Sequence, residues 1–214
     1  MKKVLCLMAA LLMVLCCTAA NAAEVTALAS EVNPENIALK IIRARITGYD
    51  EAAGTVTLVL LDNETFAEND IMNLRPGDTI FSDGETITVD KITFDLPCVE
   101  INIGEDTAED NGVILLQNND GSFNSYVMDY PITREMAEIT VKLPEAALFL
   151  DGVEPEYGDP LDTPTVHTAA EFIQMLQASI AGGGALDFAG GNVQVTFNDK
   201  SEPMIIERYY TPWQ

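Results

Sequence analysis

The sequence predicts a mainly β protein, made of small antiparallel barrel or sandwich units with one amphipathic helix, about residues 168–181, packed on a sheet. Three observations support this prediction. Apolar side chains alternate with a period of two over most of the chain, and short runs rich in Gly, Pro, Asn and Asp separate the alternating segments. A helical apolar period with start and stop signals occurs clearly once.

Residues 1–22 have the pattern of a cleavable signal peptide. Two lysines precede an apolar run over residues 4–15, and small residues lead to Ala20-Asn21-Ala22, a sequence typical of a cleavage site. The run is shorter than the roughly 20 residues that a membrane helix needs. We therefore expect a secreted or periplasmic protein that begins near Ala23 and has no membrane insertion after cleavage. A retained membrane anchor and a lipid anchor on Cys16 or Cys17 are the alternatives.

We expect residues 23–36 to form a flexible lead-in and residues 37–103 to form a β-barrel-like unit. Residues 40–47 and 55–61 alternate on either side of a Gly-containing turn, which predicts a hairpin. Its buried face should carry Ile42, Ala44 and Ile46. Further strands are expected over residues 79–81, 86–92 and 95–103.

A polar, acidic break at residues 104–112 predicts a boundary, after which residues 104–214 form a second β-rich unit that contains the helix. The two units could equally be one continuous domain. Expected elements are a hairpin around residues 118–122, one or two strands within 137–150, a non-helical crossing over 153–166 and a final hairpin around Asn198-Asp199. Thr168 and Glu171 fit a capping box at the start of the helix, and three glycines at 182–184 end it.

The net charge excludes some partner classes. The formal charge at pH 7 is −23, with 34 acidic residues against 11 basic ones. Nucleic acid is therefore not an expected partner, because phosphate binding depends on lysine and arginine. The acidic character favours solubility and attracts cations. Cys98 is the single cysteine after residue 22, so that part of the chain cannot form an internal disulfide.

Two residues are candidates for catalysis, and both are better explained by structure. His167, the one histidine, lies just before the predicted helix start, where a side chain often packs against the helix, here against Phe172. Cys98 lies in a strand pattern near Asp95 and Glu100, whose charges would raise its pKa. We therefore predict a structural histidine and a cysteine that acts as a small apolar residue. No serine stands in a nucleophile-elbow motif.

Aromatic residues are the candidates for ligand binding. The end of the chain contains Tyr209, Tyr210 and Trp213, and Tyr157 lies in the proline-rich crossing. Such side chains bind sugar rings or partner peptides. Alternation sends Tyr209 and Tyr210 to opposite faces of a strand, so one of them could equally pack in the core.

Calcium is the one candidate cofactor, and no other is expected. Asp106, Glu109 and Asp110 are candidate metal ligands, because carboxylates are the ligands that calcium prefers. A second set consists of residues without a recognisable spacing, namely Asp151, Glu154, Glu156 and Asp159. The segment 118–121 resembles part of a calcium loop but lacks its first and last ligands, so a hairpin turn is favoured.

The function that follows is a non-enzymatic binding or interaction module of the cell envelope or the extracellular space, with an unknown protein or glycan partner. The alternative is a secreted glycan hydrolase that uses two carboxylates, a chemistry that needs only two acids at the right separation. A third hypothesis is an assembly protein whose exposed strand edge pairs with another chain.

Overall fold

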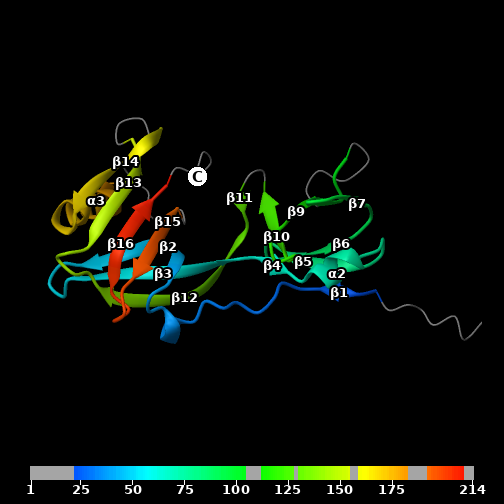
Figure 1. Cartoon of the computed structure of the whole chain (residues 1–214), viewed down its shortest axis with the longest axis horizontal. Coiled ribbons are helices and arrows are strands. Elements are labelled where there is room, and N and C mark those ends of the chain that lie inside the picture. The colour runs from blue at the N-terminus through cyan, green and yellow to red at the C-terminus, as the bar shows by residue number, and fades with distance from the viewer. Residues whose placement is uncertain (1–21, 105–111, 128–129, 155–158, 183–191, 210–214) are drawn as a thin grey trace, which may run out of the picture. The chain divides into compact units, whose positions relative to one another are not determined.

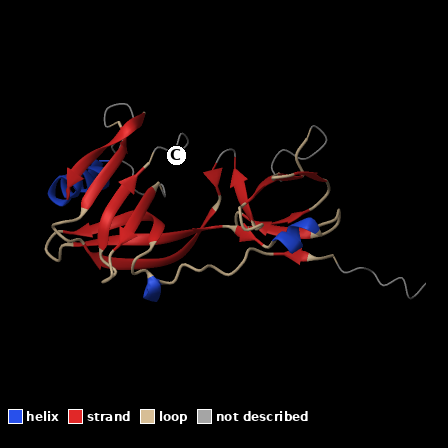
Figure 2. Ribbon diagram, viewed as in Figure 1, coloured by secondary structure: helices blue, strands red, loops and turns tan. Residues whose placement is uncertain are grey.

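The chain forms two compact units in a computed structural model that describes residues 22–104, 112–127, 130–154, 159–182 and 192–209 (Figure 1). Of residues 180–182 only the backbone is described. Unit 1 consists of Met1–Leu28 and Thr65–Tyr130, and unit 2 consists of Ala29–Glu64 and Pro131–Gln214. Strands dominate both units, as Figure 2 shows. The mainly β fold is therefore confirmed.

The described residues of unit 1 form two sheets and one short helix, α2 (Glu68–Met72). The three-stranded sheet has the order β1-β5-β6, with bounds β1 (Glu24–Val25), β5 (Thr79–Ser82) and β6 (Glu85–Thr88). The second sheet has the order β11-β10-β9-β8-β7, and β4 also pairs with β10. Its bounds are β4 (Thr65–Phe66), β7 (Ile92–Asp95), β8 (Cys98–Ile101), β9 (Val113–Gln117), β10 (Phe123–Val127) and β11 (Tyr130–Pro131).

The hairpin expected around residues 118–122 is present between β9 and β10. The expected run over 86–92, in contrast, is divided into β6 and β7. Asn102 explains the division, because its side chain binds the backbone between the two strands. Its Oδ1 accepts from the N–H groups of Asp90 and Lys91, and its Nδ2 donates to the carbonyl of Thr88. The chain therefore turns where periodicity alone would continue a strand.

The segment expected as a flexible lead-in contains regular structure. β1 pairs with β5 in parallel, with Glu24 opposite Thr79 and Val25 opposite Ile80, and Pro34–Asn36 form the 3₁₀ turn η1. Val25 is buried with the core of unit 1. Alternation over only two residues gives no usable strand signal, so this pairing with a strand more than fifty residues away could not be expected from the sequence.

Unit 2 is built on a seven-stranded sheet with the order β12-β3-β2-β15-β16-β13-β14. The bounds are β2 (Ile41–Asp50), β3 (Thr55–Asn63), β12 (Thr133–Lys142), β13 (Leu148–Val153), β14 (Pro160–Thr168), β15 (Val193–Phe197) and β16 (Pro203–Arg208). All neighbours are antiparallel except β13 and β16, which are parallel. The predicted hairpins β2–β3 and β15–β16 are both confirmed.

The helix α3 (Ala169–Gly182) covers part of one face of this sheet and contacts β2, β13 and β14 (Figure 1). Among its described side chains, those of Ala169, Phe172 and Leu176 are buried and belong to the core of unit 2. The predicted buried face of β2 belongs to the same core, since Ile42, Ala44 and Ile46 are all at most 4 % exposed. One amphipathic helix packed on a sheet is therefore confirmed.

The proline-rich crossing expected over 153–166 is in large part a strand. β14 begins at Pro160 and pairs only with β13, so it is an edge of the sheet within the described residues. Proline is tolerated at strand starts and on edge strands, where a missing N–H costs no ladder bond. Pro160 and Pro164 also make this edge a poor template for another chain. Non-helical backbone was predicted correctly, and strand pairing was missed.

A buried ion pair joins β13 to β16. Arg208 donates from Nε and Nη2 to the two carboxylate oxygens of Asp151, with both distances 2.8 Å, and both side chains are 1 % exposed. Asp151 Oδ1 also accepts from the backbone N–H of Val153 at 3.1 Å. The register places the two residues opposite each other across the parallel pairing.

The observed units differ from the expected division near residue 104. β8 and β9, on either side of the acidic break, pair with each other in one sheet of unit 1. Residues 105–111 lie outside the described part of the chain. The sheets are open within the described residues, which agrees with the sandwich form of the prediction and not with a closed barrel.

Candidate functional site

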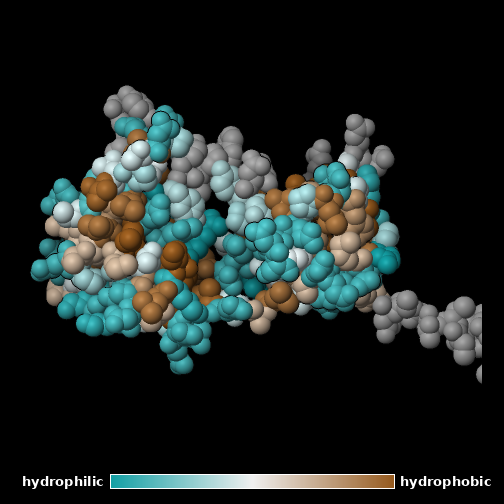
Figure 3. Space-filling view, viewed as in Figure 1, coloured by the Kyte–Doolittle hydropathy of each residue, from teal (hydrophilic) through white to brown (hydrophobic). Residues whose placement is uncertain are grey.

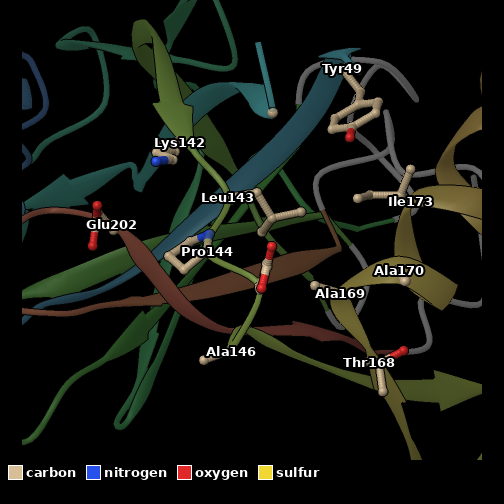
Figure 4. A pocket seen from close by; sticks show the side chains of 12 residues that line it. Tyr49, Lys142, Leu143, Pro144, Ala146, Thr168, Ala169, Ala170, Ile173 and Glu202 are labelled. Atoms are coloured by element: carbon tan, nitrogen blue, oxygen red, sulfur yellow. The ribbon is translucent and has the colours of Figure 1, made fainter. Parts of the chain in front are cut away.

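The candidate site is an open cleft of about 900 Å³ in unit 2 (Figure 4). It is lined by the end of β2, the β2–β3 turn, the end of β12, the loop from β12 to β13, the end of β14, the start of α3, and the turn between β15 and β16. The lining residues are Tyr49, Gly54, Lys142, Leu143, Pro144, Glu145, Ala146, Thr168, Ala169, Ala170, Ile173 and Glu202. Apolar residues of this unit also reach the surface, as Figure 3 shows on one face.

The β2–β3 turn and the loop after β12 form one wall of the cleft. Asp50 accepts from the N–H of Ala53 at 3.0 Å, and Gly54 has a φ of +63°, a conformation that glycine adopts without steric cost. The carbonyl of Gly54 accepts from the N–H of Leu143 at 2.9 Å, which ties the loop to the turn. Leu143 is therefore held in a fixed position beside Tyr49.

The first turn of α3 forms the opposite wall, and its capping box is confirmed. The N–H and hydroxyl of Thr168 donate to Glu171 Oε2 at 2.8 and 2.9 Å, and the N–H of Glu171 donates back to Thr168 Oγ1 at 3.3 Å. These bonds provide acceptors for backbone N–H groups that have no hydrogen-bond partner within the first turn of a helix. They also place Ile173, one turn further along the helix, on the cleft side.

The hydrogen bonds from Thr168 hold the pKa of Glu171 below its ordinary value of 4.5. A lowered folded-state pKa contributes stability above the unfolded-state value, and that contribution is lost as the pH falls through the folded value. We therefore expect Glu171→Gln to lower the melting temperature at pH 7 and to differ little from wild type near pH 2. Thermal melts between pH 2 and 7 measure this. A Glu171→Gln effect that was the same at both pH values, or no larger than that of exposed Glu138→Gln, would contradict the pairing.

An apolar centre and a polar rim give the cleft its chemistry. Figure 4 shows the side chains of Tyr49, Leu143 and Ile173 pointing toward one another, with Lys142 and Glu202 on the other side. Tyr49 and Ile173 pack against the core of the unit, and Leu143 belongs to it. Partial burial, then the charges of Glu51 and Asp50, raise the pKa of the Tyr49 phenol. The phenol is therefore a neutral hydrogen-bond donor at physiological pH.

Glu202 and Glu145 are the acidic residues among the described lining of the cleft. Glu202 is held by the β15–β16 turn, because its Oε2 accepts from Asn198 Nδ2 at 3.1 Å and its N–H donates to Asn198 Oδ1 at 2.9 Å. Glu145 is exposed in the loop after β12. The cleft can thus accept hydrogen bonds at its rim while it buries apolar groups at its centre.

His167 lies in β14, outside the cleft lining. Its ring stacks on Phe149 with centroids 5.8 Å apart, and Phe149 in turn packs on Phe172 at 4.7 Å. The predicted contact with the helix is thus made through Phe149. His167 Nε2 is buried and has no hydrogen-bond partner within the described structure. This geometry supports a packing role.

Cys98 is half-buried at the start of β8. Burial, then the charges of Glu100 and Asp95, raise the pKa of its thiol. The predicted effect of these two carboxylates is confirmed. A raised thiol pKa lowers the thiolate fraction at neutral pH, which is the opposite of what a catalytic cysteine needs.

Among the predicted ligand-binding aromatics, Tyr209 is the one that the structure describes. It is half-buried after β16, and the guanidinium carbon of Arg43 lies 5.6 Å from its ring centroid. Burial raises the pKa of the Tyr209 phenol against the opposing effect of Arg43. Tyr209 is not among the residues that line the cleft. Tyr157, Tyr210 and Trp213 lie outside the described residues.

The predicted metal ligands Asp106, Glu109 and Asp110 also lie outside the described residues, as does Glu156. Asp151, from the second candidate set, is engaged with Arg208. Across the described ranges, no group of three or more His, Cys, Asp or Glu side chains could hold a metal ion.

The segment 118–121 forms the predicted hairpin turn. The N–H of Gly121 donates to the carbonyl of Asn118 at 3.0 Å. Asp120 Oδ1 accepts from the N–H and the hydroxyl of Ser122, and these bonds lower the pKa of Asp120. Its carboxylate therefore stabilises the turn.

Sequence reasoning missed the residues that form the cleft centre. Tyr49 follows the expected strand at residues 40–47, and Leu143 lies inside the range 137–150 in which one or two strands were expected, so neither position stood out as a binding residue. Ile173 lies within the expected helix, about residues 168–181. A tyrosine just before an Asp-Glu turn is the one signal that could have been noted, but its neighbours Leu143 and Ile173 are about 90 and 120 positions away in the chain.

Comparison with protein-family models, with curated proteins and with solved structures finds no match for this chain. In the part of the chain that the structure describes, no helix has both the length and the apolar character needed to cross a membrane. Function is therefore argued from the cleft and from the sequence.

Proposed function

We propose that the protein is an exported, non-enzymatic binding module whose cleft in unit 2 takes an apolar side chain from a partner protein segment. The observation that carries this proposal is the convergence of Tyr49, Leu143 and Ile173 at the centre of an open cleft with polar groups at its rim. Binding sites of this kind bury apolar groups and orient the ligand with a few polar ones. The export part rests on the leader pattern at residues 1–22.

A peptide suits the lining better than a glycan does. Among the described residues that line the cleft, Tyr49 is the single aromatic one, and most of its neighbours are aliphatic or small. Sugar rings present hydroxyl groups all around their edges, so they need more polar partners than this centre offers. With a net charge of −23, the protein favours a neutral or basic segment over an acidic one.

A peptide-display selection on the immobilised protein tests this proposal. We expect enriched peptides with a large apolar residue, and we expect Ile173→Ala to weaken their binding about tenfold, since a lost apolar contact of this size is worth about 1–3 kcal/mol. Gln174→Ala is the matched control, because Gln174 is the exposed neighbour on the same helix and does not line the cleft. Circular dichroism checks that both variants fold.

The outcomes separate the candidate functions. Equal loss of binding in both variants, or no enriched peptide at all, would contradict a peptide site. If the protein bound oligosaccharides on an array and Ile173→Ala removed that binding, the ligand of the cleft would be a glycan and not a peptide. Glu145 and Glu202 give the hydrolase alternative a specific form: release of shorter products from such a glycan, abolished by Glu145→Gln or Glu202→Gln, would overturn the non-enzymatic proposal.

A further inference from the structure

Ala23, the first residue after the predicted leader, is held by a carboxylate in unit 1. Its backbone N–H donates to Asp78 Oδ1 at 2.8 Å, and its carbonyl accepts from the N–H of Thr79 at 2.8 Å. The preceding residue, Ala22, is exposed and lies outside regular structure. The bonds thus begin at the residue where the expected cleavage places the new chain end.

The turn before β5 fixes this carboxylate. Asp78 Oδ2 accepts from the N–H of Arg75 at 2.7 Å, and the N–H of Asp78 donates to the carbonyl of Arg75 at 3.0 Å. The carbonyl of Asp78 accepts from the N–H of Val89 at 2.9 Å. Gly77 takes a φ of +97° within this turn, which a side chain would strain. Asp78 is therefore oriented by its own turn, with Oδ1 directed to Ala23.

The strand that follows Ala23 secures the position. β1 continues directly into its parallel pairing with β5, and Val25 and Ile80 are 6 % and 0 % exposed in the core of unit 1. Beside it lies a hollow of about 210 Å³, whose lining includes Ala23 and the acidic residues Glu24 and Asp70. A positive charge at Ala23 would therefore lie among acidic groups.

We propose that removal of the leader after Ala22 creates an α-ammonium group on Ala23 that forms an ion pair with Asp78 and secures β1. A leader peptidase of the exporting membrane hydrolyses the Ala22–Ala23 peptide bond. The hydroxyl of water joins the Ala22 carbonyl carbon as the C–N bond breaks. The Ala23 nitrogen takes the remaining proton of that water and a second proton that the new Ala22 carboxylic acid releases, so that the products are a carboxylate and an ammonium. The neutral N–H donor to Asp78 thereby becomes a charged one, and charge-assisted hydrogen bonds are the stronger kind.

This inference depends on the proposed export and is independent of ligand binding in the cleft. The first experiment expresses the full chain in an exporting bacterium and determines the end of the product by intact mass and N-terminal sequencing. We expect a chain that begins at Ala23. A product that begins at another residue, or that keeps the leader, would overturn the inference and leave the peptide-binding test unaffected.

The second experiment measures thermal stability of the exported product. We expect Asp78→Asn to lower the melting temperature of unit 1 by about 2–4 °C more than Asp90→Asn, a change of the same charge at an exposed position of the same unit. Both substitutions are repeated in a chain with Gly-Ser inserted between Ala22 and Ala23. The insertion moves the ammonium two residues away and leaves an amide at Ala23.

The excess effect of Asp78→Asn should shrink in the inserted chain, because only the loss of neutral hydrogen bonds and of the Arg75 turn contact remains there. An effect of equal size in both chains would show that Asp78 serves the turn alone, and the ion pair would be rejected. Mass spectrometry confirms that the inserted product begins at the added glycine, so that its ammonium lies two residues before Ala23.

Discussion

Asp151→Ala is expected to lower the free energy of unfolding by about 3–5 kcal/mol, because it breaks a buried ion pair and leaves the other charge behind. The substitution leaves the Arg208 guanidinium 1 % exposed and without its carboxylate, so that its desolvation is no longer offset. The N–H of Val153 loses its acceptor as well. Urea denaturation followed by circular dichroism measures the change.

Two further variants make this prediction specific. Asp162→Ala removes the same charge from an exposed position of the neighbouring strand β14 and should change stability by less than about 0.5 kcal/mol. The double variant Asp151→Leu, Arg208→Met removes both charges and should recover most of the loss, because an apolar pair needs no compensation. If Asp151→Ala behaved like Asp162→Ala, the buried pair would not be a feature of the folded protein in solution.

Phe172→Ala is expected to cost about 3–5 kcal/mol, because it leaves a cavity between α3 and the sheet. Phe172 is 1 % exposed and its ring lies 4.7 Å from that of Phe149, which carries the contact with His167. The loss therefore loosens the packing of the helix that carries Ile173. We expect weaker peptide binding in the cleft in addition to lower stability.

Chemical denaturation and peptide titration together test this second prediction. Phe172→Leu fills most of the cavity and should cost clearly less than Phe172→Ala. Exposed Gln174→Ala, on the same helix, should leave both stability and binding nearly unchanged. Full stability in Phe172→Ala would mean that α3 does not pack on the sheet as described. Lost stability with unchanged peptide binding would instead show that binding in the cleft does not depend on how the helix packs on the sheet.

Local elements of the fold could be predicted because their signals lie within a few residues. The alternation of Ile42, Ala44 and Ile46 places them on one face whatever the partner strand is, since strand side chains alternate. The capping box at Thr168 and Glu171 is likewise a local set of hydrogen bonds. The same holds for the Asn118–Ser122 turn and for the effect of Asp95 and Glu100 on Cys98.

Pairings between distant segments could not be predicted. The two-residue strand β1 contains too little alternation to be recognised, and Pro160 and Pro164 conceal β14. The expected boundary near residue 104 is replaced by units that each take two separate stretches of chain. Periodicity shows which face a strand buries, but it carries no information on which neighbour forms the hydrogen bonds.

By itself, the sequence determined that this is an acidic, mainly β chain with a leader pattern and one capped amphipathic helix. The physical reason is that charge, alternation and capping are properties of single residues and their near neighbours. Tertiary structure alone decided that Asp151 faces Arg208, that Tyr49, Leu143 and Ile173 share a cleft, and that Asp78 binds Ala23. Such contacts join residues from different strands, turns and helices, whose proximity is set by the packing of the whole core.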